Sequence, residues 1–202
     1  MRKIKNTGKA LAVMLLCFCA LPWSLLLGGC SGKAPSFAPG EIVHAKITLA
    51  DERTITLELY PDIAPKTVSN FVKLCNEQFY DGLLIYRVVP NFLIQTGDPT
   101  GKGYYGSEQT IEGEFSANGY NGNTLHHERG TVSMARKPNG YNTASSQFFI
   151  CLEQCKKLDG EYAAFGKVTD GFDVLDSIAA VQTDDADRPV EDIVIRSVRI
   201  VK

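Results

Sequence analysis

Hydrophobic and polar residues alternate along two segments near the start of the main body of the chain. In residues 41–50 and 53–60, apolar side chains recur at every second position. This is the period of a β-strand with one buried face. The polar pair Asp51-Glu52 lies between the two segments. The pattern predicts two strands joined by a tight turn.

The period changes to that of a helix in residues 64–79, where Pro65 suits the first turn. A second helical pattern covers residues 171–181, with Val174, Leu175 and Ile178 on one side. The apolar positions of the first helix are Val68, Phe71, Val72, Cys75 and Phe79.

Short apolar runs separated by glycine-rich connections predict further strands. They cover residues 83–89, 92–96, 131–135, 146–151, 163–168 and 192–202. About eight strands and two helices without strand–helix alternation indicate an antiparallel sheet. A sheet of this size removes its edges by closing into a barrel or splitting into a sandwich, and periodicity alone does not choose between them.

Three of these strands place one long polar side chain beside an apolar one on the same face. The pairs are Ile85 with Arg87, Leu93 with Gln95, and Phe149 with Gln147. The opposite faces carry residues that we expect in the core: Tyr86, Val88, Ile94, Phe148 and Ile150. If the three polar faces converge, they form a groove with one cation, two amides and apolar patches. The alternative is three separately solvated faces, with Arg87 paired to a carboxylate.

The N-terminal residues have the pattern of a secretory signal. Four basic side chains precede an apolar run over residues 10–27, and Gly28 and Gly29 follow. The stretch resembles the lipobox of bacterial lipoproteins, in which Cys30 becomes a lipid-modified N-terminus. We therefore expect a lipoprotein signal peptide at 1–29, a flexible tether at 30–40 and a folded domain at 41–202. This predicts an extracytoplasmic protein, anchored to a bacterial cell membrane through the lipid on Cys30.

The acidic balance argues against nucleic acid as a partner. Removal of residues 1–29, which carry four basic and no acidic side chains, changes the formal charge from −2 to −6. The remaining 173 residues are enough for one domain. We expect a monomer. Three cysteines remain, Cys75, Cys151 and Cys155, and this odd count does not form a disulfide framework, although a Cys151–Cys155 bridge stays open.

Motifs for other chemistries are incomplete. The stretch 97–103 lacks the spacing of a phosphate-binding P-loop. His126 and His127 are neighbours and would point in opposite directions on a strand, so they would not chelate a metal together. Ser133 lacks the surroundings of a hydrolase nucleophile. We expect no cofactor and no metal ion.

Four ordered segments together resemble the cyclophilin-type peptidyl-prolyl cis-trans isomerases. They are "YRVVPNFLIQTGDPTGKG" (86–103), "LHHERGTVSMAR" (125–136), "ASSQFFI" (144–150) and "LDGEYAAFGKV" (158–168). The likeness extends from about residue 42 to 201. It implies a mainly β fold, a closed eight-stranded antiparallel β-barrel capped by two α-helices, with a proline-binding groove on the outer surface of the barrel.

The resemblance also implies the site. Its catalytic residues fall on Arg87, Gln95 and Phe92, and its substrate-binding residues on Leu93, Ala135, Arg136, Gln147, Phe149, Leu158 and Tyr162. Lys157 stands where the members that bind cyclosporin strongly have tryptophan, which puts drug sensitivity in doubt. Tyr162 replaces a common histidine but keeps an aromatic wall. The loop at 136–145 is slightly longer than in short family members.

The implied function is to accelerate rotation of X–Pro bonds in exported, folding polypeptides, without proton transfer or covalent chemistry. The proline-containing polypeptide is the expected partner. The alternative is a non-catalytic chaperone or scaffold of the same fold that binds proline-containing segments.

Overall fold

The two alternating segments fold as β1 (Val43–Leu49) and β2 (Thr54–Leu59), which pair antiparallel. The turn between them contains Glu52 with a φ of 73°. The computed structural model describes residues 35–202. The predicted hairpin at the start of the domain is confirmed.

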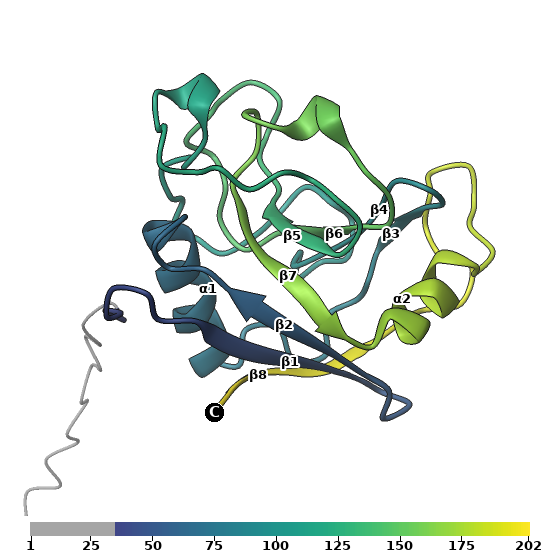
Figure 1. Cartoon of the computed structure of the whole chain (residues 1–202). Helices are drawn as coiled ribbons and strands as arrows, with labels where there is room; N and C mark the ends of the chain where they lie inside the picture. Colours follow the sequence, from purple (N-terminus) through teal and green to yellow (C-terminus); the bar gives the residue numbers. More distant parts are fainter. Residues whose placement is uncertain (1–34) are drawn as a thin grey trace, which may run out of the picture. The chain divides into compact units, whose positions relative to one another are not determined.

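Six further strands complete one antiparallel sheet, which curls around the core (Figure 1). They pair in the order β3-β4-β6-β5-β7-β2-β1-β8. In residues 35–202, two α-helices and two short 3-10 helices accompany the sheet: α1 (Pro65–Asn76), α2 (Phe172–Ala179), η1 (Ser116–Asn118) and η2 (Lys156–Leu158). The strands are β3 (Arg87–Val89), β4 (Leu93–Thr96), β5 (Thr131–Met134), β6 (Phe148–Cys151), β7 (Ala164–Asp170) and β8 (Ile195–Val201).

The sheet is an open, curled half-barrel, so the expected closed barrel is wrong. Strands β3 and β8 form the two edges, and an isolated bridge between Leu84 and Val194 links the segments that precede them. The main-chain N–H of Val88 in β3 donates to the carbonyl of Asp187, at 2.8 Å. Because a loop thus occupies the edge of β3, β8 does not pair with this strand.

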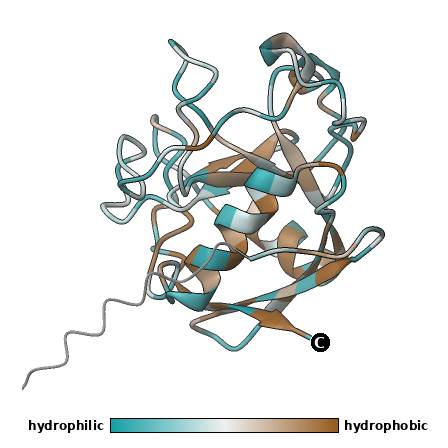
Figure 2. Cartoon of the chain, turned by 90° about the vertical axis from the view of Figure 1, so that its left-hand side faces the viewer, coloured by the Kyte–Doolittle hydropathy of each residue, from teal (hydrophilic) through white to brown (hydrophobic). Residues whose placement is uncertain are grey.

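Apolar side chains on the concave side of the sheet form the core. Val88, Ile94, Phe148 and Ile150 belong to it, as the alternation predicts. In Figure 2 the strands are largely brown, the colour of hydrophobic residues. Ile85 also packs in this core, although the alternation placed it beside Arg87. The alternation fails there because β3 begins only at Arg87.

Helix α1 begins with a carboxylate from a distant loop. Pro65 occupies the first turn, and the preceding Ala64 has no side chain that can cap the helix. The buried Glu114 accepts hydrogen bonds from the main-chain N–H of Lys66 (2.9 Å) and Thr67 (2.8 Å), and from the Thr67 hydroxyl (2.7 Å). The first N–H groups of an α-helix have no hydrogen-bond partner inside the helix, so Glu114 supplies one. Its negative charge is also attracted to the positive end of the helix dipole.

A buried histidine ties the η2 loop to β5. His127 Nδ1 lies 2.9 Å from Asp159 Oδ1, and its Nε2 lies 2.9 Å from Ser133 Oγ. Burial lowers the pKa of His127 despite the Asp159 carboxylate, so the ring is neutral and accepts a hydrogen bond from Ser133. Burial acts to raise the pKa of Asp159, but hydrogen bonds from the His127 main chain and from the His126 and His127 rings lower it.

Cys75, Cys151 and Cys155 are all free and buried, so the structure contains no Cys151–Cys155 bridge. Burial raises the pKa of each of the three thiols. They pack as small apolar side chains.

The leader and Cys30 lie outside the described residues, as do residues 31–34 of the expected tether. Within its described part, Phe37 packs against the core and the carbonyl of Pro35 accepts a hydrogen bond from Ser69 (3.1 Å). None of the helices in residues 35–202 is both long and apolar enough to span a membrane.

We expect Glu114→Ala to lower the free energy of unfolding by about 2 kcal/mol, because it leaves two N–H groups and a hydroxyl unpaired at a buried helix start. Chemical denaturation would measure the loss. Glu112→Ala is the matched control, since Glu112 pairs with the Lys66 side chain at the surface. A control as destabilised as Glu114→Ala would contradict the capping role.

The stability of the protein should fall in mild acid. Because the pKa of His127 is lower in the folded chain, the unfolded chain takes up a proton first as the pH falls through the ordinary value of 6.5. The free energy of unfolding therefore decreases below this pH and is fully retained above it. The lowered pKa of Asp159 acts in the same direction at lower pH.

Urea denaturation between about pH 5 and 8 would measure this slope. His127→Asn should flatten it, whereas His44→Asn, on β1 and outside the network, should not. An equal slope in wild type and His127→Asn would exclude His127 as its source.

Candidate active site

Strand register places the predicted polar residues on one outer face of the sheet. Arg87 in β3 is directly opposite Gln95 in β4, and Gln95 is opposite Phe149 in β6. Phe149 is in turn opposite Ser133 in β5. The three strands that alternation singled out therefore converge, and their polar faces are not separately solvated.

A second apolar cluster, separate from the core, lies on this outer face. All the apolar side chains predicted for the site belong to it. Phe149 is its centre: the His127 ring stacks on it at 6.0 Å between centroids, and the Tyr162 ring meets it edge-on at 5.7 Å. The cluster consists of Leu93, Phe149, Cys151, Cys155 and Leu158, with Phe92, Ala135 and Tyr162 packed against them. We refer to it as the proline pocket, after the role that the sequence resemblance implies for most of these residues.

The two predicted glutamines contact one another beside this pocket. Gln95 Nε2 donates to Gln147 Oε1 at 2.9 Å, and Gln147 Nε2 donates to the carbonyls of Gly103 (3.2 Å) and Tyr105 (2.6 Å). Gln95 therefore holds Gln147 in place. These bonds fix the amide of Gln147 and the start of the 103–110 loop.

Tyr86 is a site residue that sequence reasoning missed. Its hydroxyl donates to Gln147 Oε1 at 2.5 Å, and burial raises its pKa, so it remains a donor. Sequence alternation assigned Tyr86 to the core. A signal was available, because a buried tyrosine needs a partner for its hydroxyl, and Gln147 was already a candidate.

Arg87 is paired with a carboxylate that sequence analysis did not identify. Its Nε and Nη2 each lie 3.2 Å from Asp187 Oδ2. Asp187 has a φ of 63° in the loop that also bonds the edge of β3. Among residues 35–202, Arg87 Nη1 has no hydrogen-bond partner. The guanidinium thus has one edge bound to Asp187 and further donors free, and its side chain is 36% exposed.

Arg136 is buried beside the site, whereas Lys157 lies at its rim. Arg136 is folded inward against Glu161, with its side chain 8% exposed. The Lys157 ammonium lies over the ring of Phe92, 4.4 Å from its centroid, at the rim of the proline pocket.

A hollow of about 590 Å³ adjoins these residues. Gln95, Ala135, Arg136 and Gln147 line it together with the 103–110 and 137–145 segments. Ala135 belongs to both features, because it packs against the apolar cluster and also lines the hollow. We call the hollow and the adjoining apolar cluster the groove.

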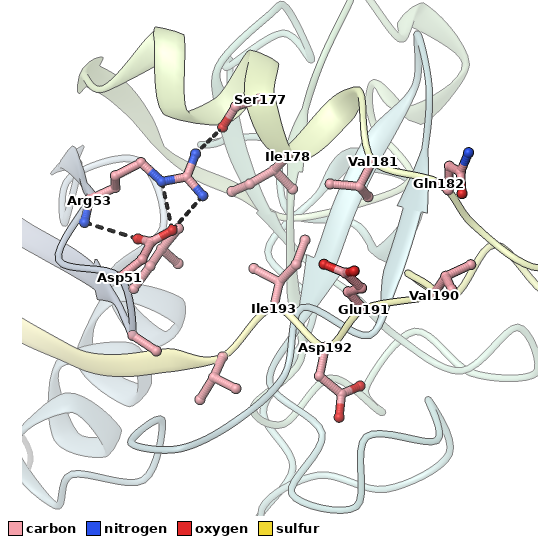
Figure 3. A pocket seen from close by; sticks show the side chains of 13 residues that line it. Asp51, Arg53, Ser177, Ile178, Val181, Gln182, Val190, Glu191, Asp192 and Ile193 are labelled. Atoms are coloured by element: carbon pink, nitrogen blue, oxygen red, sulfur yellow. Dashed lines mark hydrogen bonds and ion pairs between the residues drawn. The ribbon is translucent and has the colours of Figure 1, made fainter.

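Another hollow, of about 500 Å³, lies between the β1–β2 turn, α2 and residues 190–194 (Figure 3). Its arginine, Arg53, is bound to Asp51 and Ser177. It has no aromatic side chain among its lining residues and contains none of the predicted site residues. Within residues 35–202, no three His, Cys, Asp or Glu side chains are grouped as metal ligands.

Comparisons with known proteins agree with this geometry. Residues 44–200 match the family model described as cyclophilin type peptidyl-prolyl cis-trans isomerase/CLD. A solved cyclophilin-type isomerase of Cryptosporidium parvum superposes with a TM-score of 0.73 at 30% identity, covering 80% of this chain and 99% of that one. That isomerase has also been solved in the presence of the dipeptide Ala-Pro.

Curated relatives carry the same activity in their names. Peptidyl-prolyl cis-trans isomerase-like 1 of Aspergillus niger is 42% identical over 149 residues, which cover 74% of this chain and 90% of that protein. Peptidyl-prolyl cis-trans isomerase-like 2 of Gibberella zeae is 42% identical over 147 residues, 73% of this chain but only 25% of that protein.

The sources of the relatives correct one expectation from the sequence. Curated relatives of this chain come from fungi and from the plant Arabidopsis thaliana. This contradicts the predicted location as a lipid-anchored protein of a bacterial cell membrane. By the family match over most of its length and by these relatives, the chain belongs to the cyclophilin-type peptidyl-prolyl cis-trans isomerases and is an isomerase of X–Pro bonds.

Proposed function

We propose that Arg87 catalyses X–Pro rotation by donating a hydrogen bond to the proline nitrogen of a peptide whose ring occupies the proline pocket. The observation that carries this proposal is the register of β3, β4 and β6. It places a guanidinium with free donors in the same row as Phe149, the centre of that pocket.

The chemistry of the bond explains why a donor is sufficient. Rotation crosses a barrier of about 18–20 kcal/mol because the amide loses its resonance. As the bond twists, the proline nitrogen becomes pyramidal and regains a lone pair that the planar amide does not offer. A donor fixed at that nitrogen stabilises the twisted state more than either planar isomer, and this difference accelerates the reaction. Arginine suits the role because it stays charged and has rigid donors.

The proline pocket binds the ring without holding it strongly. Phe92, Leu93, Phe149 and Leu158 would cover the apolar ring, with Tyr162 as a wall. At about 25 cal/mol per Å² of apolar area, a ring as small as pyrrolidine gains only a few kcal/mol. Weak binding favours rapid release of the product.

Main-chain and amide groups beside the pocket would hold the substrate backbone. Gln95 and Gln147 are held by one another and by Tyr86, so their orientation is set before the peptide arrives. Ala135 and the main chain of Arg136 line the same groove and would hold the residue beside the proline.

Asp187 sets the direction of the Arg87 side chain in this proposal. Its carboxylate occupies the Nε edge of the guanidinium and leaves Nη1 for the substrate. The pair is partly exposed, so it orients the side chain more than it stabilises the fold.

Lys157 gives the pocket a rim unlike that of cyclosporin-sensitive relatives. Its ammonium covers one face of Phe92 where those members present an indole. We infer weak cyclosporin binding on this basis. We also propose that residues 41–202 are the isomerase unit and that proline-containing polypeptides are its substrates.

We expect Arg87→Ala to lower turnover of an X–Pro test peptide by well over about tenfold, because the donor is lost. A protease-coupled assay of cis-to-trans conversion would measure it, with circular dichroism to verify the fold. Arg196→Ala, on β8 and paired with Glu52, is the control and should keep full turnover. Unchanged turnover in Arg87→Ala would refute the assignment and favour a groove that only binds proline segments.

We expect Asp187→Asn to lower turnover by about threefold to tenfold, because a neutral amide orients the guanidinium less firmly than a carboxylate does. Asparagine tolerates the left-handed backbone at this position, so the loop should keep its conformation. The same assay measures the change. A rise in turnover would show instead that Asp187 competes with the substrate for the donors of Arg87.

A further inference from the structure

We propose that the side chain of Arg136 is a positioning residue that fixes the Tyr162 wall of the proline pocket, an inference that rests on the proposed function of the groove. The resemblance assigns a role only to the main chain at this position. The side chain makes contacts that the main-chain role does not require.

Glu161 holds one edge of the Arg136 guanidinium. Arg136 Nε donates to the main-chain oxygen of Glu161 at 3.0 Å, and Nη2 lies 3.1 Å from Glu161 Oε2. Arginine side chains are seldom this buried unless they are paired. The two bonds join the strand end after β5 to the loop after η2, because Arg136 and Glu161 belong to these separate segments.

The same guanidinium lies over three aromatic rings. Its carbon lies 4.7 Å from the centroid of Tyr162, 5.0 Å from that of Tyr141 and 5.5 Å from that of Phe115. Phe115 and Tyr141 meet edge-on at 5.5 Å, and Tyr162 meets Phe149 edge-on at 5.7 Å. A continuous row of side chains thus leads from Phe115 through Arg136 to the centre of the proline pocket.

This arrangement couples two parts of the groove through one residue. Ala135 and Arg136 line the hollow of about 590 Å³, and Ala135 N–H donates to the carbonyl of Gln147 at 2.9 Å. The side chain of Arg136 meanwhile holds Tyr162. The half-buried Tyr162 ring contacts Phe149 on one side and the guanidinium on another, so loss of the guanidinium frees it to leave the pocket.

The expected consequence is on substrate binding and not on the chemical step. Tyr162 contacts the bound proline in both planar isomers and in the twisted state. An interaction made equally in all these states changes KM and leaves kcat nearly unchanged. Lysine cannot replace arginine here, because it has neither the planar fork nor the flat faces.

We would measure kcat and KM of the full chain by NMR exchange on an Ala-Pro-containing tetrapeptide. Arg136→Ala should raise KM by about fivefold or more with kcat within about twofold, and Arg136→Lys should recover little of the loss. The matched control is Arg129→Ala. Arg129 also pairs with a carboxylate, Asp176, and lies 5.2 Å from the centroid of Phe172, outside the groove. Its KM should equal that of wild type.

A double-mutant cycle separates positioning from general stability. If Arg136 acts through Tyr162, Arg136→Ala should raise KM by less than about twofold once Tyr162 is already alanine. An equal rise in both backgrounds, or a loss of kcat with KM unchanged, would overturn the proposal. Arg87→Ala, run alongside, tests the proposed function separately. A fall in its turnover together with an unaltered KM in Arg136→Ala overturns the Arg136 proposal alone.

Discussion

The site depends on one requirement, that β4 and β6 bury apolar side chains on both of their faces. Successive side chains of a strand point to opposite sides, so these two short strands serve two separate apolar clusters. Ile94, Phe148 and Ile150 enter the core, while Leu93 and Phe149 enter the proline pocket. A pocket built on the sheet itself is more rigid than one built on loops, and this keeps Phe149 fixed relative to Arg87, which lies in the same row two strands away.

Buried polar groups then complete what the strands begin. Behind Phe149, Ser133, His127 and Asp159 form a hydrogen-bonded chain between β5 and the loop that carries Leu158 and Tyr162. In front of it, Tyr86, Gln95 and Gln147 form a second chain that reaches the 103–110 loop. Satisfied buried networks of this kind specify one arrangement of their surroundings. The η2 loop and the 103–110 loop are therefore both anchored to the sheet by hydrogen bonds.

Local patterns predicted the elements and the convergence of the three strands, because alternation and helical spacing are properties of short segments. They failed at Ile85 and Tyr86, where the regular strand had not yet begun. They could not reveal Asp187, which is 100 residues from Arg87, or Glu114, which is 47 residues from Thr67. Such pairings depend on how distant loops return to the sheet. Strand β3 remains an edge strand for the same reason. The N–H of Val88 donates to the carbonyl of Asp187, in a distant loop, and not to β8.

The two arginines of the groove show how surroundings assign different roles to one side chain. The guanidinium of Arg136 lies over aromatic rings and donates through Nε and Nη2 to Glu161, so few donors remain and it acts as a fixed part of the wall. Arg87 has one edge occupied and is partly exposed, so it can still bond an incoming peptide. A donor for a twisted amide needs both properties. A free guanidinium would lose side-chain entropy when it bound the nitrogen, and one as enclosed as Arg136 could not reach the nitrogen at all. The single carboxylate of Asp187 places Arg87 between these limits.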